Sequence, residues 1–210
     1  MALNRNIADN RVAVTRTALT AALEDHFPEG SIDTAKWNLS GAEGTWSIQD
    51  GTLKCVKAGN DWANNIILSA TTNFTAVHII ARLKWTGQGR MVVFRSNKTA
   101  GSGYGVQLRS DGKFRLENWG VGSLSEVSYT FVSGTWYWVE IIATGNRIES
   151  RVWVDGQAAP SNWQIKYTDT SVLFSSGAVG FAMEDAASDP NAYFDDMIVN
   201  GRVPINYRYP

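Results

Sequence analysis

Apolar and polar residues alternate in short runs from about residue 23 onward, and turn-forming pairs separate these runs about every eight to twelve residues. The clearest turn pairs are Asp50-Gly51, Asp111-Gly112, Gly145-Asn146 and Asp155-Gly156. The period of an amphipathic helix is absent apart from a weak candidate within Thr15–Leu23. Strands that follow one another without crossover helices predict an all-β fold, an antiparallel two-sheet β-sandwich.

The hydrophobic pattern determines the register of a hairpin around Asp111-Gly112. Leu108 and Phe114 must share the buried face, because side chains alternate between the two faces of a strand. A two-residue turn would set Arg109 opposite Phe114 and mix the faces. A three-residue loop, 110–112, sets Leu108 opposite Phe114 and requires Gly112 in the left-handed region. The outer face of this hairpin then carries Gln107, Arg109, Lys113, Arg115, Glu117 and Trp119.

A second hairpin turns at Gly145-Asn146, where a two-residue loop satisfies the pattern. It pairs Glu140 with Arg151 and Trp138 with Trp153 on one face. The opposite face is apolar and is assigned to the core, with Val139, Ile141, Val152 and Val154. Trp138 and Trp153 are therefore predicted to lie on the more polar side of their sheet.

The composition narrows the class of protein. Of the 210 residues, 44% are hydrophobic and 19% are charged, which suits a folded chain with a real core. The 19 Lys and Arg against 20 Asp and Glu offer neither a basic surface for nucleic acid nor a polybasic membrane patch. No run reaches 18 apolar residues, so no membrane insertion is expected. The single cysteine, Cys55, is interpreted as a small buried residue.

Residues 1–22 differ from the rest, since they contain no aromatic residue and carry Arg5, Arg11 and Arg16. They hold too few large apolar groups to fold alone. We interpret them as an extended N-terminal arm that docks on a partner or a sister subunit, the alternative being a floppy terminus. The folded domain is assigned to 23–203, and the tail 204–210 is a candidate second contact. No secretory signal is recognised.

Several motifs follow one another in a distinctive order: Trp46-Ser47-Ile48-Gln49-Asp50-Gly51, Trp136-Tyr137, Arg151-Val152-Trp153-Val154-Asp155-Gly156 and Tyr193-Phe194-Asp195-Asp196-Met197. In this order and spacing they resemble the concanavalin A-like lectin/glucanase superfamily, the jelly-roll group that includes laminin G-like modules. The resemblance implies a jelly-roll sandwich. It does not choose a function, because this fold hosts enzymes, lectins, adhesion modules and virion parts.

The resemblance also implies a candidate calcium site. In that superfamily the first and last strands pair, which would bring Glu24-Asp25 close to Asp195-Asp196, and members often hold a structural calcium ion there. Asp25 and Asp195 are the candidate ligands, since carboxylates suit a hard cation. The alternative is that the aspartates of the last strand cap that strand or pair with arginine.

The hydrolases of the superfamily resemble one another in an E-x-D-x-(x)-E strand, and no glutamate of this chain has an aspartate two residues later. Glu140 faces Arg151, which favours an ion pair, and neither His26 nor His78 has an evident partner. We therefore expect no catalytic function.

Sugar binding requires an aromatic surface with polar neighbours. The candidate ligand-binding residues come from the first hairpin and its surroundings in the superfamily pattern: Arg95, Tyr104, Gln107, Arg109, Arg115, Glu117 and Trp119. Trp138 and Trp153, with Arg5, Arg11 and Arg16, are candidate interface residues. Packing is the alternative for each tryptophan, and Trp37, Trp46 and Trp136 are assigned to the core.

Together these features favour a non-catalytic jelly-roll protein attached to a larger assembly through its arm. A chain that begins with Met and lacks an export signal suits a virion, as a phage decoration, cement or tail-associated protein that binds other subunits and a cell-surface glycan. The alternative is an extracellular carbohydrate-binding module of a secreted enzyme. A second alternative is a glycoside hydrolase or polysaccharide lyase.

Overall fold

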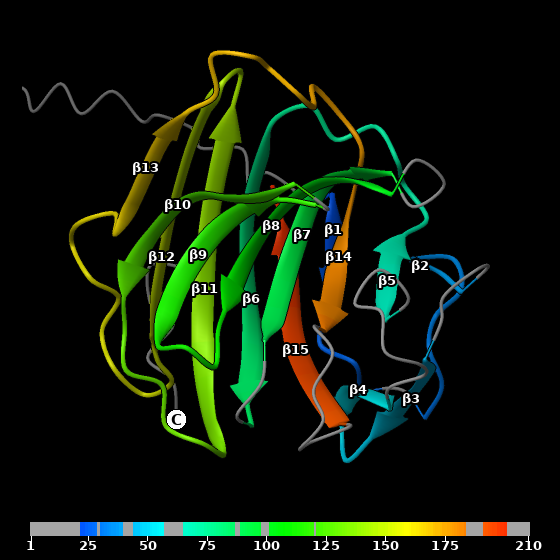
Figure 1. Ribbon diagram of the computed structural model, residues 1–210. Coiled ribbons are helices and arrows are strands. Elements are labelled where there is room, and N and C mark those ends of the chain that lie inside the picture. The colour runs from blue at the N-terminus through cyan, green and yellow to red at the C-terminus, as the bar shows by residue number, and fades with distance from the viewer. Residues whose placement is uncertain are drawn as a thin grey trace, which may run out of the picture.

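The computed structural model describes residues 22–28, 30–39, 44–56, 65–86, 89–97, 101–119, 121–183 and 191–200. Within these ranges two antiparallel sheets pack face to face and no helix occurs, as Figure 1 shows. This is the predicted jelly-roll β-sandwich. The described part holds no helix that could cross a membrane. Arg5, Arg11, Arg16 and the tail 204–210 lie outside it, so the docking arm stays a prediction.

The larger sheet has eight strands. In spatial order they are β13 (Ile165–Thr168), β12 (Arg147–Val154), β11 (Thr135–Thr144), β6 (Val77–Trp85), β15 (Asn191–Val199), β4 (Thr52–Val56) and β3 (Thr45–Gln49), and β1 (Leu23–Asp25) pairs with β15. β1 and β15 meet with Asp25 opposite Met197, which confirms that the first and last strands pair.

The other sheet has seven strands and lies in front of the first in Figure 1. In spatial order they are β10 (Gly122–Ser128), β9 (Lys113–Asn118), β8 (Ser102–Leu108), β7 (Arg90–Asn97), β14 (Ala178–Met183), β5 (Ile66–Ser69) and β2 (Trp37–Asn38).

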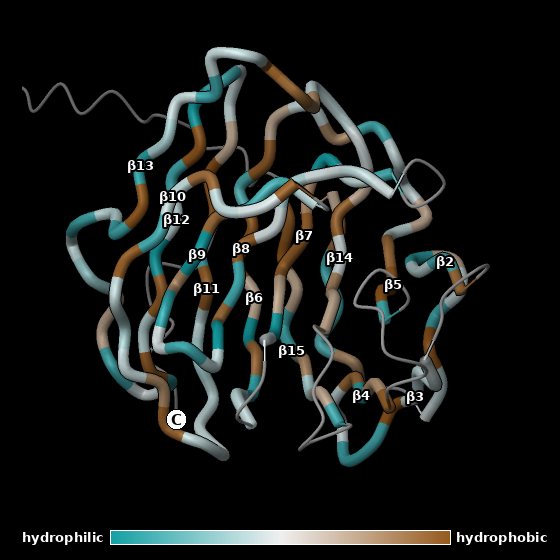
Figure 2. Tube along the Cα trace, in the orientation of Figure 1, coloured by the Kyte–Doolittle hydropathy of each residue, from teal (hydrophilic) through white to brown (hydrophobic). Residues whose placement is uncertain are grey.

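Both predicted hairpin registers are confirmed. Leu108 pairs with Phe114, and Gly112 has a φ of 74°, so the three-residue loop needs a residue that tolerates the left-handed region. In the second hairpin Glu140 pairs with Arg151. The alternation of hydrophobic and hydrophilic residues along these strands is visible in Figure 2.

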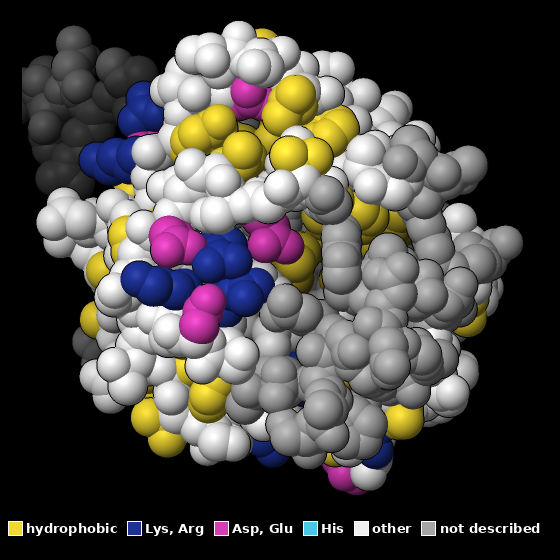
Figure 3. Space-filling view, in the orientation of Figure 1, with side chains coloured by type: hydrophobic (Ala, Val, Ile, Leu, Met, Phe, Trp, Pro, Cys, Tyr) yellow, Lys and Arg dark blue, Asp and Glu magenta, His cyan; other side chains and the backbone are white. Residues whose placement is uncertain are grey.

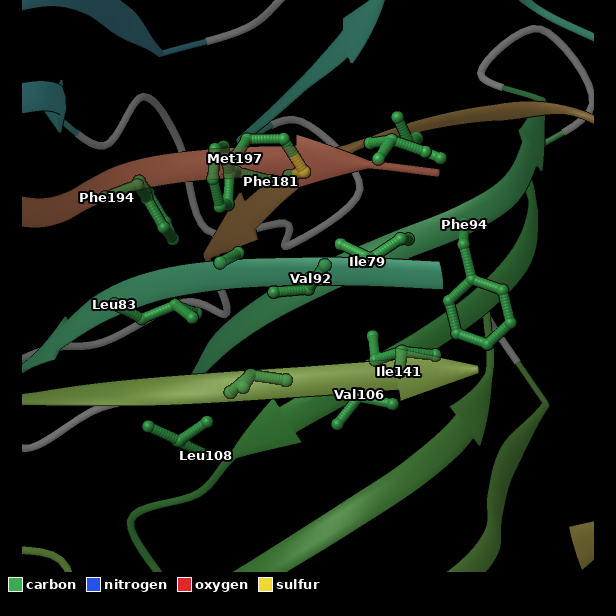
Figure 4. Packing of buried hydrophobic residues seen from close by; sticks show 14 of the residues in the cluster. Ile79, Leu83, Val92, Phe94, Val106, Leu108, Ile141, Phe181, Phe194 and Met197 are labelled. Carbon is green, nitrogen blue, oxygen red and sulfur yellow. The ribbon is translucent and has the colours of Figure 1, made fainter. Parts of the chain in front are cut away.

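The core lies between the sheets, where side chains of both inner faces meet (Figure 4). The Phe181 ring of β14 stacks on the Phe194 ring of β15, with 4.6 Å between centroids. Each ring is fully buried, and burial of one such side chain stabilises the fold by about 1.5–3 kcal/mol. Cys55 also lies in this core, as predicted, and burial raises the pKa of its thiol to about 12 against a small opposing effect of Arg90.

Trp37 lies in the core as assigned, and Trp46 packs half-buried against it. The assignment of Trp136 to the core is wrong. Tyr137 takes the inward position of β11, so the strand's alternation turns Trp136 to the outer face, beneath the guanidinium of Arg82 at 4.9 Å.

Candidate functional site

The outer face of the eight-stranded sheet gathers charged and aromatic side chains from five strands or their ends. On β6, Val77, Ile79, Ala81 and Leu83 face the core, so the residues between them face outward. We call this surface the polar face; its members are Glu24, His26, His78, Arg82, Trp136, Trp138, Glu140, Arg151, Trp153, Asp155, Asp195 and Asp196.

His78 and Glu140 form one pair on the polar face. His78 Nε2 lies 2.8 Å from Glu140 Oε1, and Arg151 donates from Nε to the other carboxylate oxygen at 2.6 Å. Burial raises the pKa of Glu140, but the hydrogen bonds from His78 and Arg151 outweigh burial and hold the pKa below its ordinary value. A carboxylate kept ionised in this way fixes the orientation of the imidazole and leaves Nδ1 on its far side.

Arg82 is the centre of a second group. Its guanidinium contacts Asp195, donates to Asp155 at 3.2 Å, and lies 3.0 Å from Asp196. It also lies over the rings of Trp136 and Trp138, at 4.9 Å and 5.6 Å from their centroids. Although burial opposes the charge, the hydrogen bond to Asp195 and the three carboxylates raise the pKa of Arg82. The group is thus a desolvated cation enclosed by anions and indoles.

A bulge in β15 brings two consecutive aspartates to the polar face. The register with β6 shifts between Asp195 and Ile198, and Asp196 has a φ of 48°, which is rare for any residue with a side chain. In a regular strand Asp196 would point into the core. Burial and then repulsion from Asp196 outweigh the hydrogen bond from Arg82, so the pKa of Asp195 lies above its ordinary value.

His26 approaches the same bulge from the residue after β1. Its Nδ1 lies 2.6 Å from Asp196 Oδ1 and its Nε2 lies 2.9 Å from Glu24 Oε1, so both ring nitrogens are occupied. The expectation that His26 and His78 lack partners is therefore wrong. Asp196 and Glu140 come from strands distant in sequence, where no local pattern shows them, whereas Glu24 lies only two residues before His26.

Trp138 and Trp153 stack across β11 and β12 with centroids 6.5 Å apart, on the side predicted for them. The single chain already buries both, to 2% and 6% exposure. Arg82 lies over Trp138, and Arg151 lies over Trp153 and Trp163. Little indole surface is left for a partner subunit, and contact with one stays a prediction.

The predicted glycan residues divide into three groups. Arg109, Arg115 and Glu117 lie on the outer face of the seven-stranded sheet, as predicted. There Arg109, Asp111, Lys113, Arg115 and Glu126 form a charged patch, which Figure 3 shows over β8, β9 and β10. Arg115 lies 2.7 Å from Glu126 and 3.5 Å from Asp111. Ligand contact by this group stays a prediction.

Arg95 and Tyr104 do not reach that face. Arg95 has a φ of 48° at a bulge in β7, and its buried guanidinium donates to the carbonyls of Thr75, Gly145 and Phe174. Tyr104 points inward, because β8 alternates, and donates its hydroxyl to Asp169. Burial, followed by this hydrogen bond, raises the pKa of Tyr104 to about 12. Both side chains therefore lie in the interior of the domain and not on the predicted binding face.

Gln107 and Trp119 do belong to the outer side of the seven-stranded sheet, but both are buried there, at 1% and 3% exposure. Gln107 accepts a hydrogen bond from Arg109 at 3.1 Å. Trp119 packs in an apolar cluster with Ile66 and Met91. Within the described ranges neither side chain presents a free surface.

Asp25 and Asp195, the candidate calcium ligands, accept hydrogen bonds from different residues. Asp25 accepts hydrogen bonds from the Trp37 indole at 2.7 Å and from the Phe27 amide at 3.0 Å. Asp195 is held by Arg82. The described residues include no group of three or more His, Cys, Asp or Glu side chains suited to a metal ion. Calcium binding by Asp25 and Asp195 stays a prediction.

Comparisons with known proteins give a family and a fold. The family model of the 3-keto-alpha-glucoside-1,2-lyase-like domain matches residues 24–200. The chain has no significant match among curated protein sequences.

Three solved structures show the fold. The carbohydrate-binding module CBM66 from Bacillus subtilis is 18% identical, with 78% of this chain and 94% of that chain covered and a TM-score of 0.62. The β-glucanase of Bacillus licheniformis is 13% identical, with 88% and 100% covered and a TM-score of 0.62. A β-1,3-glucanase from Mycobacterium marinum is 14% identical, with 86% and 98% covered and a TM-score of 0.59. These likenesses confirm the concanavalin A-like fold.

The expectation of a protein without catalytic function is wrong in the light of these matches. The matching family is named for a lyase, and glucanases share the fold. The absence of an E-x-D-x-(x)-E strand argues only against the hydrolase mechanism that uses two carboxylates, one on each side of the glycosidic bond. A lyase breaks that bond by elimination, which does not require such a pair. A place in a virion finds no support in the comparisons.

Proposed function

The chain belongs to the 3-keto-alpha-glucoside-1,2-lyase-like domain family, and on that premise we propose that it is a carbohydrate-active enzyme that breaks a glycosidic bond by elimination. The observation that carries the proposal is the His78–Glu140 pair on the polar face, an imidazole held by a buried carboxylate. The substrate class is a glycoside whose sugar carries a ketone at C3.

Such a substrate needs a base. The C3 ketone acidifies the hydrogen on C2, and a base that removes this proton leaves an enolate. When the C3 carbonyl of the enolate re-forms, the electron pair of the enolate forms a double bond between C1 and C2. The bond from C1 to the glycosidic oxygen breaks at the same time, and that oxygen takes up a proton. The products are an enone and an alcohol.

His78 suits the role of this base. Its Nε2 contacts Glu140 at 2.8 Å, and no hydrogen bond joins its Nδ1 to another described residue. The side chain is 34% exposed, so a substrate can reach it. Glu140 acts as the positioning residue, because it selects the tautomer with the proton on Nε2 and stabilises the imidazolium that forms.

His26 makes a matched control, since both of its nitrogens already contact carboxylates. It resembles His78 in exposure and in lying on the polar face, but it has no free nitrogen to accept a proton.

The test uses p-nitrophenyl 3-keto-α-glucoside and its unoxidised parent. Elimination gives nitrophenol together with an ultraviolet-absorbing enone, whereas hydrolysis gives nitrophenol alone. We expect enone from the ketone substrate only. His78→Gln should lower kcat by about 100-fold or more, and His26→Gln should leave it within about twofold. Glu140→Gln should lower kcat and move the pH profile.

Two outcomes would count against the proposal in different ways. If no 3-keto glycoside yields an enone, the activity itself is wrong. If the enone forms at full rate with His78→Gln, the activity stands but the base lies elsewhere.

A further inference from the structure

A cavity of about 290 Å³ lies at one end of the sandwich, away from the polar face. It opens between the β8–β9 loop, the connection from β10 to β11, and the last residue of β6. The lining residues on which the argument rests are Trp85, Arg109, Ser128, Tyr129, Thr130 and Phe131. Ser128 and Thr130 are exposed, so the cavity is open to solvent. Its volume is near the lower end of the range for small-molecule sites, about 300–1,000 Å³.

One side of the cavity is an aromatic wall. The ring centroids of Tyr129 and Phe131 are 4.8 Å apart, and those of Trp85 and Phe131 are 5.8 Å apart. Tyr137 supports the wall from behind, edge-on to both Tyr129 and Phe131. Rings held this way offer a preformed flat surface to the C–H face of a ligand.

Two donors in this wall have no hydrogen-bond partner among the residues that the structure describes. The Trp85 indole nitrogen is buried and makes no hydrogen bond to any described residue. A buried donor left unpaired is costly, which makes it a natural contact for a ligand oxygen. The Tyr129 hydroxyl likewise has no hydrogen bond within the described ranges. Burial, followed by the nearby Tyr137, raises the pKa of Tyr129, so its hydroxyl keeps its proton.

Arg109 supplies the polar edge and is already paired with a carboxylate. Its Nε lies 3.1 Å from Asp111 Oδ2 and its Nη1 lies 3.1 Å from Gln107 Oε1. Lys113 donates to the Ser128 hydroxyl at 3.2 Å. A guanidinium paired with a carboxylate favours a neutral hydroxyl over a second anion.

We propose that this cavity binds one pyranose ring of a neutral saccharide. The aromatic wall takes the ring's C–H face, while the Trp85 indole, the Tyr129 hydroxyl and the Arg109 guanidinium contact its hydroxyl groups. The site rests on the proposed function only in sharing its ligand class. It is distinct from His78, because the seven residue steps from His78 to Trp85 along β6 span about 23 Å.

The site therefore anchors a saccharide at one end of the domain while the proposed base lies far along the same strand. Trp85 faces the core side and His78 faces outward, so a single sugar ring cannot touch both.

The test is a titration of the full chain, labelled with 15N at its indole nitrogens, with the methyl pyranosides of glucose, galactose, mannose and N-acetylglucosamine. Trp85→Phe identifies the Trp85 signal and removes its donor while keeping an aromatic ring. We expect at least one pyranoside to shift that signal. Trp85→Phe should weaken binding about fivefold and Arg109→Met about tenfold. Trp163→Phe, in a loop over the polar face, should leave the Kd unchanged.

If none of the four pyranosides shifts the Trp85 signal, the proposal is wrong. It is also wrong if binding is undiminished in both Trp85→Phe and Arg109→Met, with unchanged melting temperatures showing that both variants fold. Methyl pyranosides carry a hydroxyl at C3 and cannot undergo the elimination. Failure of this binding site and failure of the lyase activity are therefore separate results.

Discussion

His26 Nδ1 lies 2.6 Å from Asp196 Oδ1, across 170 residues of sequence, and Asp196 also lies 3.0 Å from the guanidinium of Arg82. One carboxylate thus ties the residue after β1 to both β15 and β6. The contact depends on the bulge that turns Asp196 outward, and its strength depends on the protonation of His26.

Stability should vary with pH through His26. Burial lowers its pKa, but the hydrogen bonds to Asp196 and Glu24 outweigh burial, and the pKa lies above the ordinary value of 6.5. The protonated ring therefore stabilises the fold fully below pH 6.5, and this contribution is lost as the pH rises through the folded-state pKa. In thermal melts across pH, His26→Gln should have a lower Tm than the wild type in acid, with the gap closing in alkali. A gap of constant size would contradict this linkage.

The Glu140 carboxylate should show the opposite pH dependence. Because its folded-state pKa is depressed, its contribution is present above the ordinary value of 4.5 and is lost as the pH falls through the folded-state pKa. Glu140→Gln should cost about 1–3 kcal/mol in urea unfolding at neutral pH and progressively less in acid. Glu126→Gln, which breaks an exposed pair with Arg115, should cost less than about 1 kcal/mol. Equal costs for the two variants would mean that burial of Glu140 does not matter.

The backbone at Asp196 should discriminate between side chains. At a φ of 48° asparagine is tolerated, whereas a β-branched residue is strained. Asp196→Asn and Asp196→Val both remove the charge, so their difference reports the backbone strain together with the hydrogen bonds to His26 and Arg82 that only asparagine can keep. We expect Asp196→Val to be less stable by about 1–2 kcal/mol in chemical denaturation. Equal stabilities would show that the bulge relaxes without cost.

A methyl group at Gly180 should be poorly tolerated. A Cβ there would lie 2.0 Å from the carbonyl oxygen of Ile67 on the neighbouring strand β5, and backbone atoms cannot move aside cheaply. Gly180→Ala should cost about 1–3 kcal/mol in urea unfolding. Gly30→Ala is the control, since a Cβ there meets no atom of the described residues within 4 Å. A wild-type midpoint for Gly180→Ala would mean that β14 and β5 separate readily.

Much of the fold follows from local pattern. Two hairpins were predicted in the registers that the structure shows, one from the alternation around Leu108 and Phe114 and one from the turn at Gly145-Asn146. Alternation also turned His78 outward. The pairing of β6 with β11, which brings His78 to Glu140, joins strands 62 residues apart and has no local signature. The prediction for Trp136 was wrong for a related reason. Adjacent residues of a strand face opposite sides, and only the tertiary structure decides that Tyr137, and not Trp136, faces the core.

The sequence by itself determined the all-β class, the faces of the hairpins and the superfamily, because side-chain period and turn chemistry act over a few residues. Tertiary structure alone decided which charges meet. It brought Arg82 to three carboxylates, turned Asp196 outward at a bulge, buried Arg95 and Tyr104, and opened the cavity beside Trp85. These contacts join strands far apart in the chain, and their geometry depends on sheet order and on single-residue bulges that alternation does not encode.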